Sequence, residues 1–166
     1  MGAKHLVLTG LFALTMMVLA GCGFSPMYGS SGVANELDDI RVETGQERID
    51  YLLQEALYDQ LGSRGSSGSF TLRAETDITT LGLGVGADAI ASRFAVRLNV
   101  SYQLFVDGQA EAVMTGHAFG EASYDVSSSV YGSLTAERDA QERAAEMAAE
   151  RMVVQLVRGF QDQDTW

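Results

Sequence analysis

Hydrophobic and polar residues alternate most strictly over residues 93–104. Apolar side chains occupy every even position from Phe94 to Leu104, and polar side chains occupy most of the odd positions. A period of two that is held this long predicts a β-strand with one buried face. A shorter alternation of the same kind predicts another strand over residues 70–78.

A third long strand is predicted over residues 109–125, because the two sides of this segment differ in character. The dipeptide Asp107-Gly108 precedes it and is favoured in two-residue hairpin turns. One side is expected to pack on the core, and the other is expected to meet water. The small or apolar side consists of Ala110, Ala112, Met114, Gly116, Ala118 and Ala122, and the polar side carries Glu111, Thr115, His117 and Glu121.

Three other segments have weaker patterns. Residues 37–43 alternate loosely and predict a short strand with Ile40 and Val42 pointing inward. Residues 63–69 are rich in Gly and Ser and predict a loop. Residues 82–86 read Gly-Leu-Gly-Val-Gly, which predicts a second loop between the first two long strands.

Helical spacing of apolar residues predicts a helix over residues 46–61. Gly62 suits its C-cap, where a left-handed residue is favoured. The apolar stripe is formed by Ile49, Leu52, Leu53, Ala56, Leu57 and Leu61, and Glu47, Asp50, Gln54 and Asp59 are expected to lie off it.

A second and longer helix is predicted over residues 135–160, where six alanines favour helical backbone. Asp139 and Arg143 are four residues apart and are expected to form an ion pair. Residues 161–166 are expected to fray. The packing side is expected to consist of Ala145, Ala149, Met152, Val153, Leu156 and Phe160.

The predicted order is strand, helix, three strands and helix. One-sided strands and one-sided helices indicate an α+β fold, a two-layer sandwich in which two helices pack on one face of a four-stranded mixed sheet. The opposite face of the sheet is expected to be polar. We expect residues 36–166 to form this single domain.

The N-terminal residues 1–21 are typical of a signal peptide. Lys4 gives a weakly basic start, and Leu6–Ala20 is a stretch of 15 residues without charge. The alternative is an uncleaved membrane-spanning helix, which needs about 20 apolar residues. The short stretch favours cleavage.

The cleavage region Leu19-Ala20-Gly21-Cys22 resembles the lipobox of bacterial lipoproteins. The resemblance implies that Cys22 becomes the first residue of the mature chain and is lipidated, with acyl chains such as palmitate. The alternative is a small buried thiol. Residues 22–35 would then be a lipidated tether, and Gly23, in place of an aspartate, favours the outer membrane over the inner one.

Net charge restricts the possible partners. The full chain carries −11, and removal of Lys4 with the signal peptide leaves −12 with arginine as the sole basic residue. Such a chain is not expected to bind nucleic acid, which requires a basic surface.

Catalytic patterns are weak, so we expect no enzyme, no metal site and no cofactor. His117 has no second ligand at metal spacing. Residues 127–129 with His117 and Asp125 contain the residue types of a Ser-His-Asp set but lack the context of a nucleophile elbow. The glycine-rich segment 82–86 lacks the Lys-Ser/Thr that follows a phosphate loop.

Three arginines, Arg73, Arg93 and Arg97, are predicted on the polar sheet face. Cross-strand pairing with carboxylates is the favoured interpretation. The alternative is that these guanidinium groups bind an anion such as phosphate. The candidate carboxylates are Glu75, Asp77, Glu111 and Glu121.

The start of the mature chain, Cys22-Gly23-Phe24-Ser25-Pro26-Met27-Tyr28-Gly29, closely resembles that of the LptE family of lipopolysaccharide-assembly lipoproteins. The order of the predicted elements is also similar in outline, including Ser123-Tyr124 near a strand end. The resemblance implies a plug that sits inside the LptD outer-membrane β-barrel, binds lipopolysaccharide and helps deliver it to the outer leaflet.

Two other functions remain open on the sequence alone. One is a periplasm-facing lipoprotein that binds another envelope protein or a ligand. The other is an envelope hydrolase, which the missing arrangement of nucleophile and base disfavours.

Overall fold

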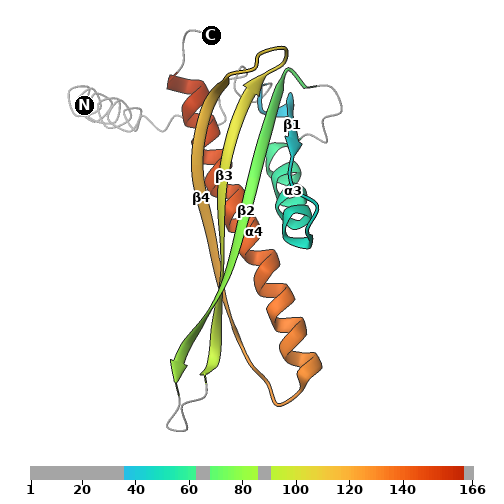
Figure 1. The fold of residues 1–166 in the computed structure, drawn as a ribbon, viewed down its shortest axis with the longest axis vertical. Coiled ribbons are helices and arrows are strands. Elements are labelled where there is room, and N and C mark those ends of the chain that lie inside the picture. The colour runs from blue at the N-terminus through green and yellow to red at the C-terminus, as the bar shows by residue number, and fades with distance from the viewer. Residues whose placement is uncertain (1–35, 63–67, 86–90, 163–166) are drawn as a thin grey trace, which may run out of the picture. The chain divides into compact units, whose positions relative to one another are not determined.

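The computed structural model describes residues 36–62, 68–85 and 91–162 (Figure 1). The chain divides into two units, Met1–Ser30 and Ser31–Trp166, and all described residues belong to the second. The elements are β1 (Ile40–Glu43), α3 (Arg48–Leu61), β2 (Phe70–Val85), β3 (Ala91–Val106), β4 (Ala112–Asp125) and α4 (Val130–Asp162). This is the predicted order.

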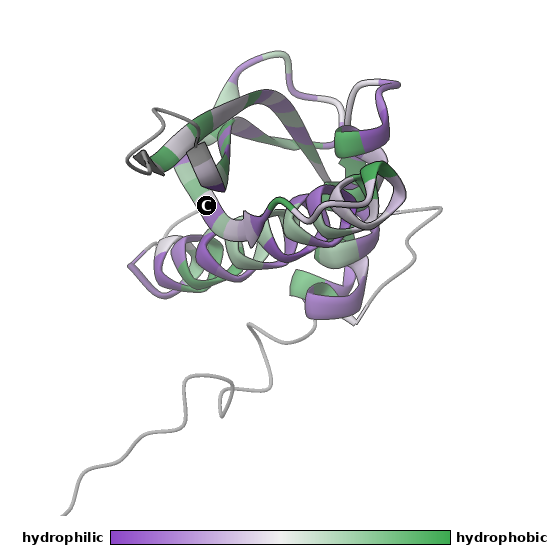
Figure 2. Ribbon diagram, turned by 90° about the horizontal axis from the view of Figure 1, so that it is seen from below, coloured by the Kyte–Doolittle hydropathy of each residue, from purple (hydrophilic) through white to green (hydrophobic). Residues whose placement is uncertain are grey.

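The four strands form one mixed sheet in the order β1-β2-β3-β4. β1 runs parallel to β2, and the other neighbours are antiparallel. Figure 2 shows hydrophobic and hydrophilic positions alternating along the strands, and both helices cover one face of the sheet. The predicted α+β architecture is confirmed.

The predicted loop over residues 82–86 is wrong for the part that the structure describes. Gly82 to Val85 continue β2, and their backbone pairs with β3, as in Gly82 opposite Phe94 and Val85 opposite Ala91. Backbone pairing does not require a side chain, so the antiparallel partner keeps a glycine-rich segment extended. Gly86 lies outside the described residues.

A turn at Asp107-Gly108 is confirmed, but the two-residue hairpin is wrong, because residues 107–111 join β3 to β4 and β4 begins later than predicted. Gly108 has a φ of +79°, and the Gln109 N–H donates to the Val106 carbonyl at 3.0 Å. Regular pairing starts at Ala112, because the register shifts between Leu104 and Phe105. Ala110 is therefore exposed and does not belong to the packing face.

β1 is also shorter than predicted, since it begins at Ile40 and residues 36–38 form a helical turn. Ile40 and Val42 are buried as predicted, and Leu37 is buried as well.

α3 begins two residues later than predicted and ends where expected. Gly62 has a φ of +76°, and its N–H donates to the Tyr58 carbonyl, which confirms the predicted C-cap. The prediction that Asp50 lies off the packing side is wrong, because Asp50 is only 6 % exposed. Its carboxylate accepts hydrogen bonds from the Glu47 N–H at 2.9 Å and from the Thr76 hydroxyl at 2.5 Å.

α4 is longer than predicted at both ends, and Gln161 and Asp162, which were expected to fray, are helical. The Ser133 N–H donates to the Ser129 carbonyl, and the Gly132 N–H donates to the Ser129 hydroxyl, so Ser129 satisfies backbone donors of the first turn. The six residues predicted for the packing side are all buried. The Asp139–Arg143 ion pair is confirmed.

The core lies between the helices and the inner face of the sheet. Its largest fully buried side chains come from both layers, including Leu72, Leu98 and Leu104 of the sheet and Leu53 and Met152 of the helices. β4 presents small residues to α4, so the two backbones lie close together. Among the described residues, no helix is long and apolar enough to cross a membrane.

Candidate functional site

The side chains that face away from the helices form the outer sheet face. They occupy the odd positions of β2, β3 and β4, because successive side chains point to opposite sides of a strand. Most are exposed. The outer sheet face consists of Arg73, Glu75, Asp77, Thr79, Leu81 and Leu83 of β2, Arg93, Arg97, Asn99, Ser101, Gln103 and Phe105 of β3, and Thr115, His117, Phe119, Glu121, Ser123 and Asp125 of β4.

Two ion pairs join β3 to β4 directly across the outer sheet face. The Arg93 guanidinium donates twice to Asp125, at 2.8 and 3.1 Å, and Arg97 donates to Glu121 at 2.7 Å. The hydrogen bond from Arg93 lowers the pKa of the Asp125 carboxyl from its ordinary value, and Asp125 in turn raises the pKa of Arg93. Both pairs join residues in register.

The third arginine finds its partner on the short edge strand. Arg73 donates to Glu43 of β1 at 3.0 Å. Cross-strand pairing is therefore confirmed for the three predicted arginines, but Glu121 is the single acid of the predicted set that takes part. Within the described residues, Glu75, Asp77 and Glu111 form no ion pair with an arginine.

Aromatic rings give the outer sheet face an apolar component that the sequence analysis missed. Arg73 lies over the Phe105 ring at 4.7 Å from its centroid, and Arg97 lies 5.9 Å from the centroid of Phe119. Phe119 is 47 % exposed, and Arg151 of α4 lies over the same ring at 4.2 Å. The sequence signal for this apolar component was Phe119, an aromatic residue at an odd position of β4.

Side chains of α4 also close the outer edge of β4. Arg143 donates to the Ser123 carbonyl at 3.1 Å, and Gln155 donates to the His117 carbonyl at 3.0 Å. Arg151 donates to the Phe119 carbonyl between them. These are the carbonyls that a further strand would bind, so this edge of the sheet is protected.

The residues of the hypothetical Ser-His-Asp set are not brought together. His117 lies beside Ser101, with 3.1 Å between its Nδ1 and the Ser101 Oγ. Asp125 lies eight residues further along β4 than His117, which is about 26 Å at the usual rise of a strand. It is bound to Arg93. No cluster of metal-ligating side chains occurs within the part of the chain that the structure describes.

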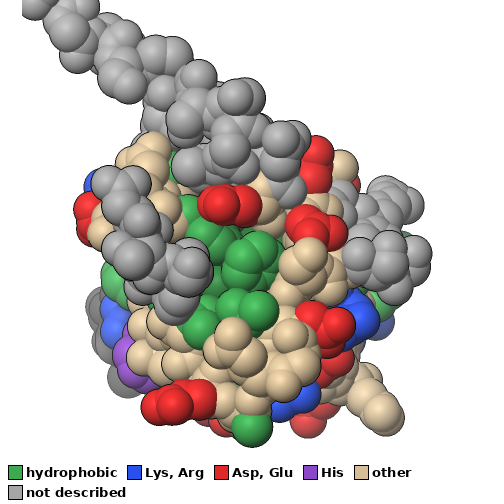
Figure 3. All heavy atoms as spheres, turned by 90° about the horizontal axis from the view of Figure 1, so that it is seen from above, with side chains coloured by type: hydrophobic (Ala, Val, Ile, Leu, Met, Phe, Trp, Pro, Cys, Tyr) green, Lys and Arg blue, Asp and Glu red, His purple; other side chains and the backbone are tan. Residues whose placement is uncertain are grey.

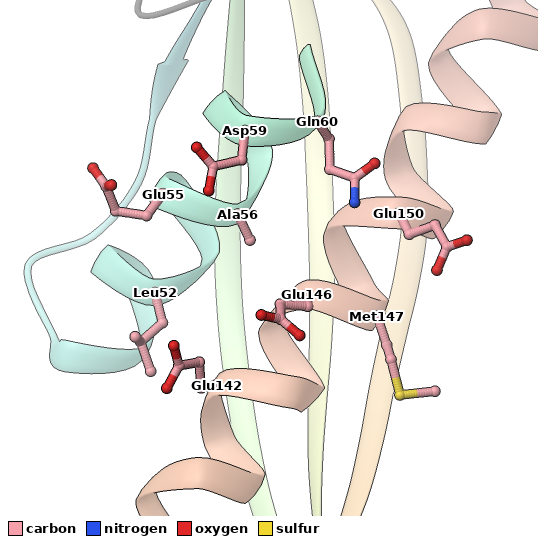
Figure 4. Close-up of a pocket in the computed structure, with 9 residues that line it drawn as sticks. All are labelled: Leu52, Glu55, Ala56, Asp59, Gln60, Glu142, Glu146, Met147 and Glu150. Carbon is pink, nitrogen blue, oxygen red and sulfur yellow. The ribbon is translucent and has the colours of Figure 1, made fainter. Parts of the chain in front are cut away.

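A groove of about 380 Å³ runs between α3 and α4 (Figure 4). Leu52, Ala56 and Met147 supply its apolar surface. Its other lining residues are Glu55, Asp59, Gln60, Glu142, Glu146 and Glu150. Its five carboxylates repel phosphate, so this groove does not suit an anion.

Apolar side chains also gather at one end of the sheet. Figure 3 shows them framed by carboxylates in the view from above. Phe70 at the start of β2 and Met114 near the start of β4 are partly buried at this end. The Phe70 and Phe160 rings pack edge to face, with 5.2 Å between their centroids. Cys22, the predicted lipidation residue, lies outside the described residues.

Comparison with known proteins gives one family match. Residues 37–156 match the family model described as LptE, lipopolysaccharide-assembly. A comparison with curated protein sequences gives no match.

Three solved structures share the fold. A protein of Caulobacter crescentus CB15 that is assigned as a lipoprotein is 28% identical with a TM-score of 0.67, over 82% of this chain and 100% of that one. A minor lipoprotein of Acinetobacter baumannii is 17% identical with a TM-score of 0.59, over 75% of this chain and 93% of that one. The rare lipoprotein B of Shewanella oneidensis is 10% identical with a TM-score of 0.58, over 76% of this chain and 98% of that one.

Proposed function

The chain belongs to the LptE lipopolysaccharide-assembly family, and on this premise we propose that it pairs with an outer-membrane β-barrel of the LptD kind. Membership of the family implies a role in lipopolysaccharide assembly, and the family consists of non-enzymatic lipoproteins. The proposed role is that of a plug in the barrel, which assists transport of lipopolysaccharide to the outer leaflet.

The observation that best supports the proposal is the outer sheet face. It is broad and polar, and its arginines are already paired with carboxylates. Barrel interiors are lined by polar side chains. Arginines that already have carboxylate partners can be covered by such a wall without becoming unpaired charges.

We further propose that Cys22 is lipidated and holds the mature chain at the periplasmic side of the outer membrane. The lipobox Leu19-Ala20-Gly21-Cys22 and the lipoprotein character of the family support this. Two or more acyl chains anchor a protein stably, whereas one alone binds marginally.

Lipopolysaccharide is the proposed cargo, and its phosphates carry the same sign of charge as this chain. Binding of a phosphate at Arg97 or Arg93 would have to displace a carboxylate of this same surface. Direct binding of lipopolysaccharide to these arginines is therefore expected to depend on salt concentration.

Copurification from outer membranes tests the pairing. Ser101 lies near the middle of the outer sheet face, so a Ser101→Trp variant should prevent a barrel wall from closing over it. We expect this variant to retain much less of the barrel protein than the unmodified chain does. The matched control is Glu146→Trp, a change to the same bulky residue on the exposed side of α4, and it should retain the barrel.

Depletion of the protein should block the appearance of lipopolysaccharide at the cell surface, and Cys22→Ala should abolish acylation and membrane retention. Two results together would favour the alternative of a lipoprotein that binds some other envelope component. The chain would purify without a barrel, and depletion would leave surface lipopolysaccharide normal.

A further inference from the structure

We infer that the second half of β2 is a docking site for an extended segment of a partner protein, bound as an additional strand. The site, here called the open β2 edge, consists of residues 74–83. The segment it fits carries apolar residues at one end and basic residues at the other. The inference does not depend on the proposed pairing with a barrel.

The open β2 edge exists because β1 is short. β1 ends at Glu43, which lies opposite Arg73, whereas β2 continues to Val85 (Figure 1). The Phe70 N–H donates to the Asp39 carbonyl at 3.2 Å, on the β1 side of the strand. Since backbone groups alternate in direction along a strand, the even positions of β2 direct their N–H and C=O groups to this side.

The polar backbone groups of the open β2 edge lack partners within residues 36–62, 68–85 and 91–162. Within these ranges, no hydrogen bond reaches the edge-directed groups of Thr76, Ile78, Thr80 or Gly82. The odd positions, by contrast, bond to β3 along the whole hairpin. A row of unpaired groups on a long strand is a template for another strand.

The two edges of the sheet differ in how their outward backbone groups are covered. On β4, three α4 side chains cover the carbonyls of His117, Phe119 and Ser123. The open β2 edge has no such cover among the described residues. Its sequence contains no Lys or Pro, which commonly protect an exposed edge, and its charged residues are Glu75 and Asp77.

Side chains beside the open β2 edge indicate which residue types a bound strand would carry. Leu81 and Leu83 are 42 % and 40 % exposed at one end of it, on the outer sheet face. Glu75 and Asp77 lie at the other end of the same face, and neither forms an ion pair within the described residues. A matching strand would place apolar residues beside the leucines and Lys or Arg beside the carboxylates.

A second copy of the chain fits this site less well than a basic partner. Each copy carries a net charge of −11, so two copies repel one another. Pairing of β2 with another β2 would also leave Glu75 and Asp77 of both copies without a cation.

Amide hydrogen exchange of the mature chain tests the inference. In the protein alone, the amides of Thr76, Ile78, Thr80 and Gly82 should exchange quickly, while those of Asp77 and Thr79 stay protected by β3. The probe is a synthetic peptide of about ten residues, the length of a long strand. It has Val at alternate positions in one half and Lys at alternate positions in the other, and it should protect the even-numbered amides.

Variants separate strand pairing from general attraction between charges. Thr80→Pro removes one edge N–H that β3 does not use, so it should abolish protection by the peptide while the sheet stays folded. Glu75→Lys combined with Asp77→Lys should weaken binding about tenfold. The control Glu142→Lys lies on α4 and should change affinity by much less, and a scrambled peptide of the same composition should not protect the even-numbered amides.

Three results would overturn the inference. The even-numbered amides could be protected in the protein alone and at all concentrations, which would mean that another part of this chain covers them. Protection could appear with rising protein concentration, which would identify a second copy as the occupant. The peptide could also leave them unprotected at millimolar concentration.

Discussion

Gly120 of β4 lies directly against the carbonyl oxygen of Ala144 on α4, and a β-carbon built on Gly120 would come within 1.8 Å of that oxygen. Gly116, Ala118 and Ala122 continue the same small side of β4. The stripe lets the helix lie close to the strand. Because the Ala144 oxygen belongs to the helix backbone, it cannot move away from a new β-carbon as the end of a flexible side chain could.

Gly120→Ala is therefore expected to lower the free energy of unfolding by about 1–3 kcal/mol, the usual range for overpacking. Chemical denaturation measures the change. Ser123→Ala is the control, since Ser123 lies on the exposed face of the same strand and its substitution should change stability by less than about 0.5 kcal/mol. Equal effects of the two substitutions would mean that α4 does not approach β4 this closely.

Asp50 and Thr76 offer a second test, because they join α3 to β2 through a hydrogen bond of 2.5 Å next to the core. Asp50→Ala should lower the free energy of unfolding by about 2 kcal/mol, since it leaves the Glu47 N–H and the Thr76 hydroxyl without their acceptor. The measurement is again chemical denaturation.

A double-mutant cycle with Thr76→Val isolates that bond. The two changes should couple by about 0.5–3 kcal/mol, as expected for residues in contact. Strict additivity would show that Asp50 acts through the helix N-terminus alone.

The sequence was a good guide wherever a local pattern determines the structure. The alternation over residues 93–104 sets which side of β3 is buried, and the Leu-rich stripe sets the packing side of α3. Gly82 was misjudged because composition suggested a loop, whereas pairing with Phe94 keeps it in the strand.

Long-range contacts explain the other omissions. Asp50 was placed off the packing side because charged residues are rarely buried, and its partner Thr76 is 26 positions away. Arg151 and Phe119 are 32 positions apart, so the closing of the β4 edge depends on the path of α4 and has no local signature. The tether and Cys22 stay predictions from the sequence.

Tyr102 should make stability fall in alkaline solution. Burial raises the pKa of its hydroxyl, which donates to the Gln155 Oε1 at 2.7 Å. A tyrosine whose pKa is higher in the folded state than in the unfolded state stabilises the fold fully below the unfolded value of about 10. That contribution is lost as the pH rises through the folded pKa.

Denaturation of the unmodified chain and of Tyr102→Phe between about pH 8 and pH 11 measures this effect. At the lower pH, the variant should be less stable by about 1 kcal/mol, because it lacks the hydrogen bond. The difference should shrink as the pH rises past about 10. A constant difference across the range would contradict a raised pKa at Tyr102.

Arg151 should protect β4 from pairing with other chains as well as stabilise the fold. Its guanidinium donates to the Phe119 carbonyl and lies over the Phe119 ring. Arg151→Ala removes both contacts, so the free energy of unfolding should fall by about 1 kcal/mol. It also frees the central one of the three covered carbonyls, and an uncovered edge strand associates with others. Sedimentation should therefore show self-association at lower protein concentration than for the unmodified chain.

The control for that experiment is Arg158→Ala, which removes the same charge from the same helix. Arg158 forms no hydrogen bond or ion pair with the residues that the structure describes, so this variant should be as stable as the unmodified chain and should associate no more readily. Both variants make this acidic protein more negative by one charge, so repulsion between copies rises equally in the two. If both associated equally, the effect would not be specific to Arg151, and association of Arg151→Ala alone would locate it at the β4 edge.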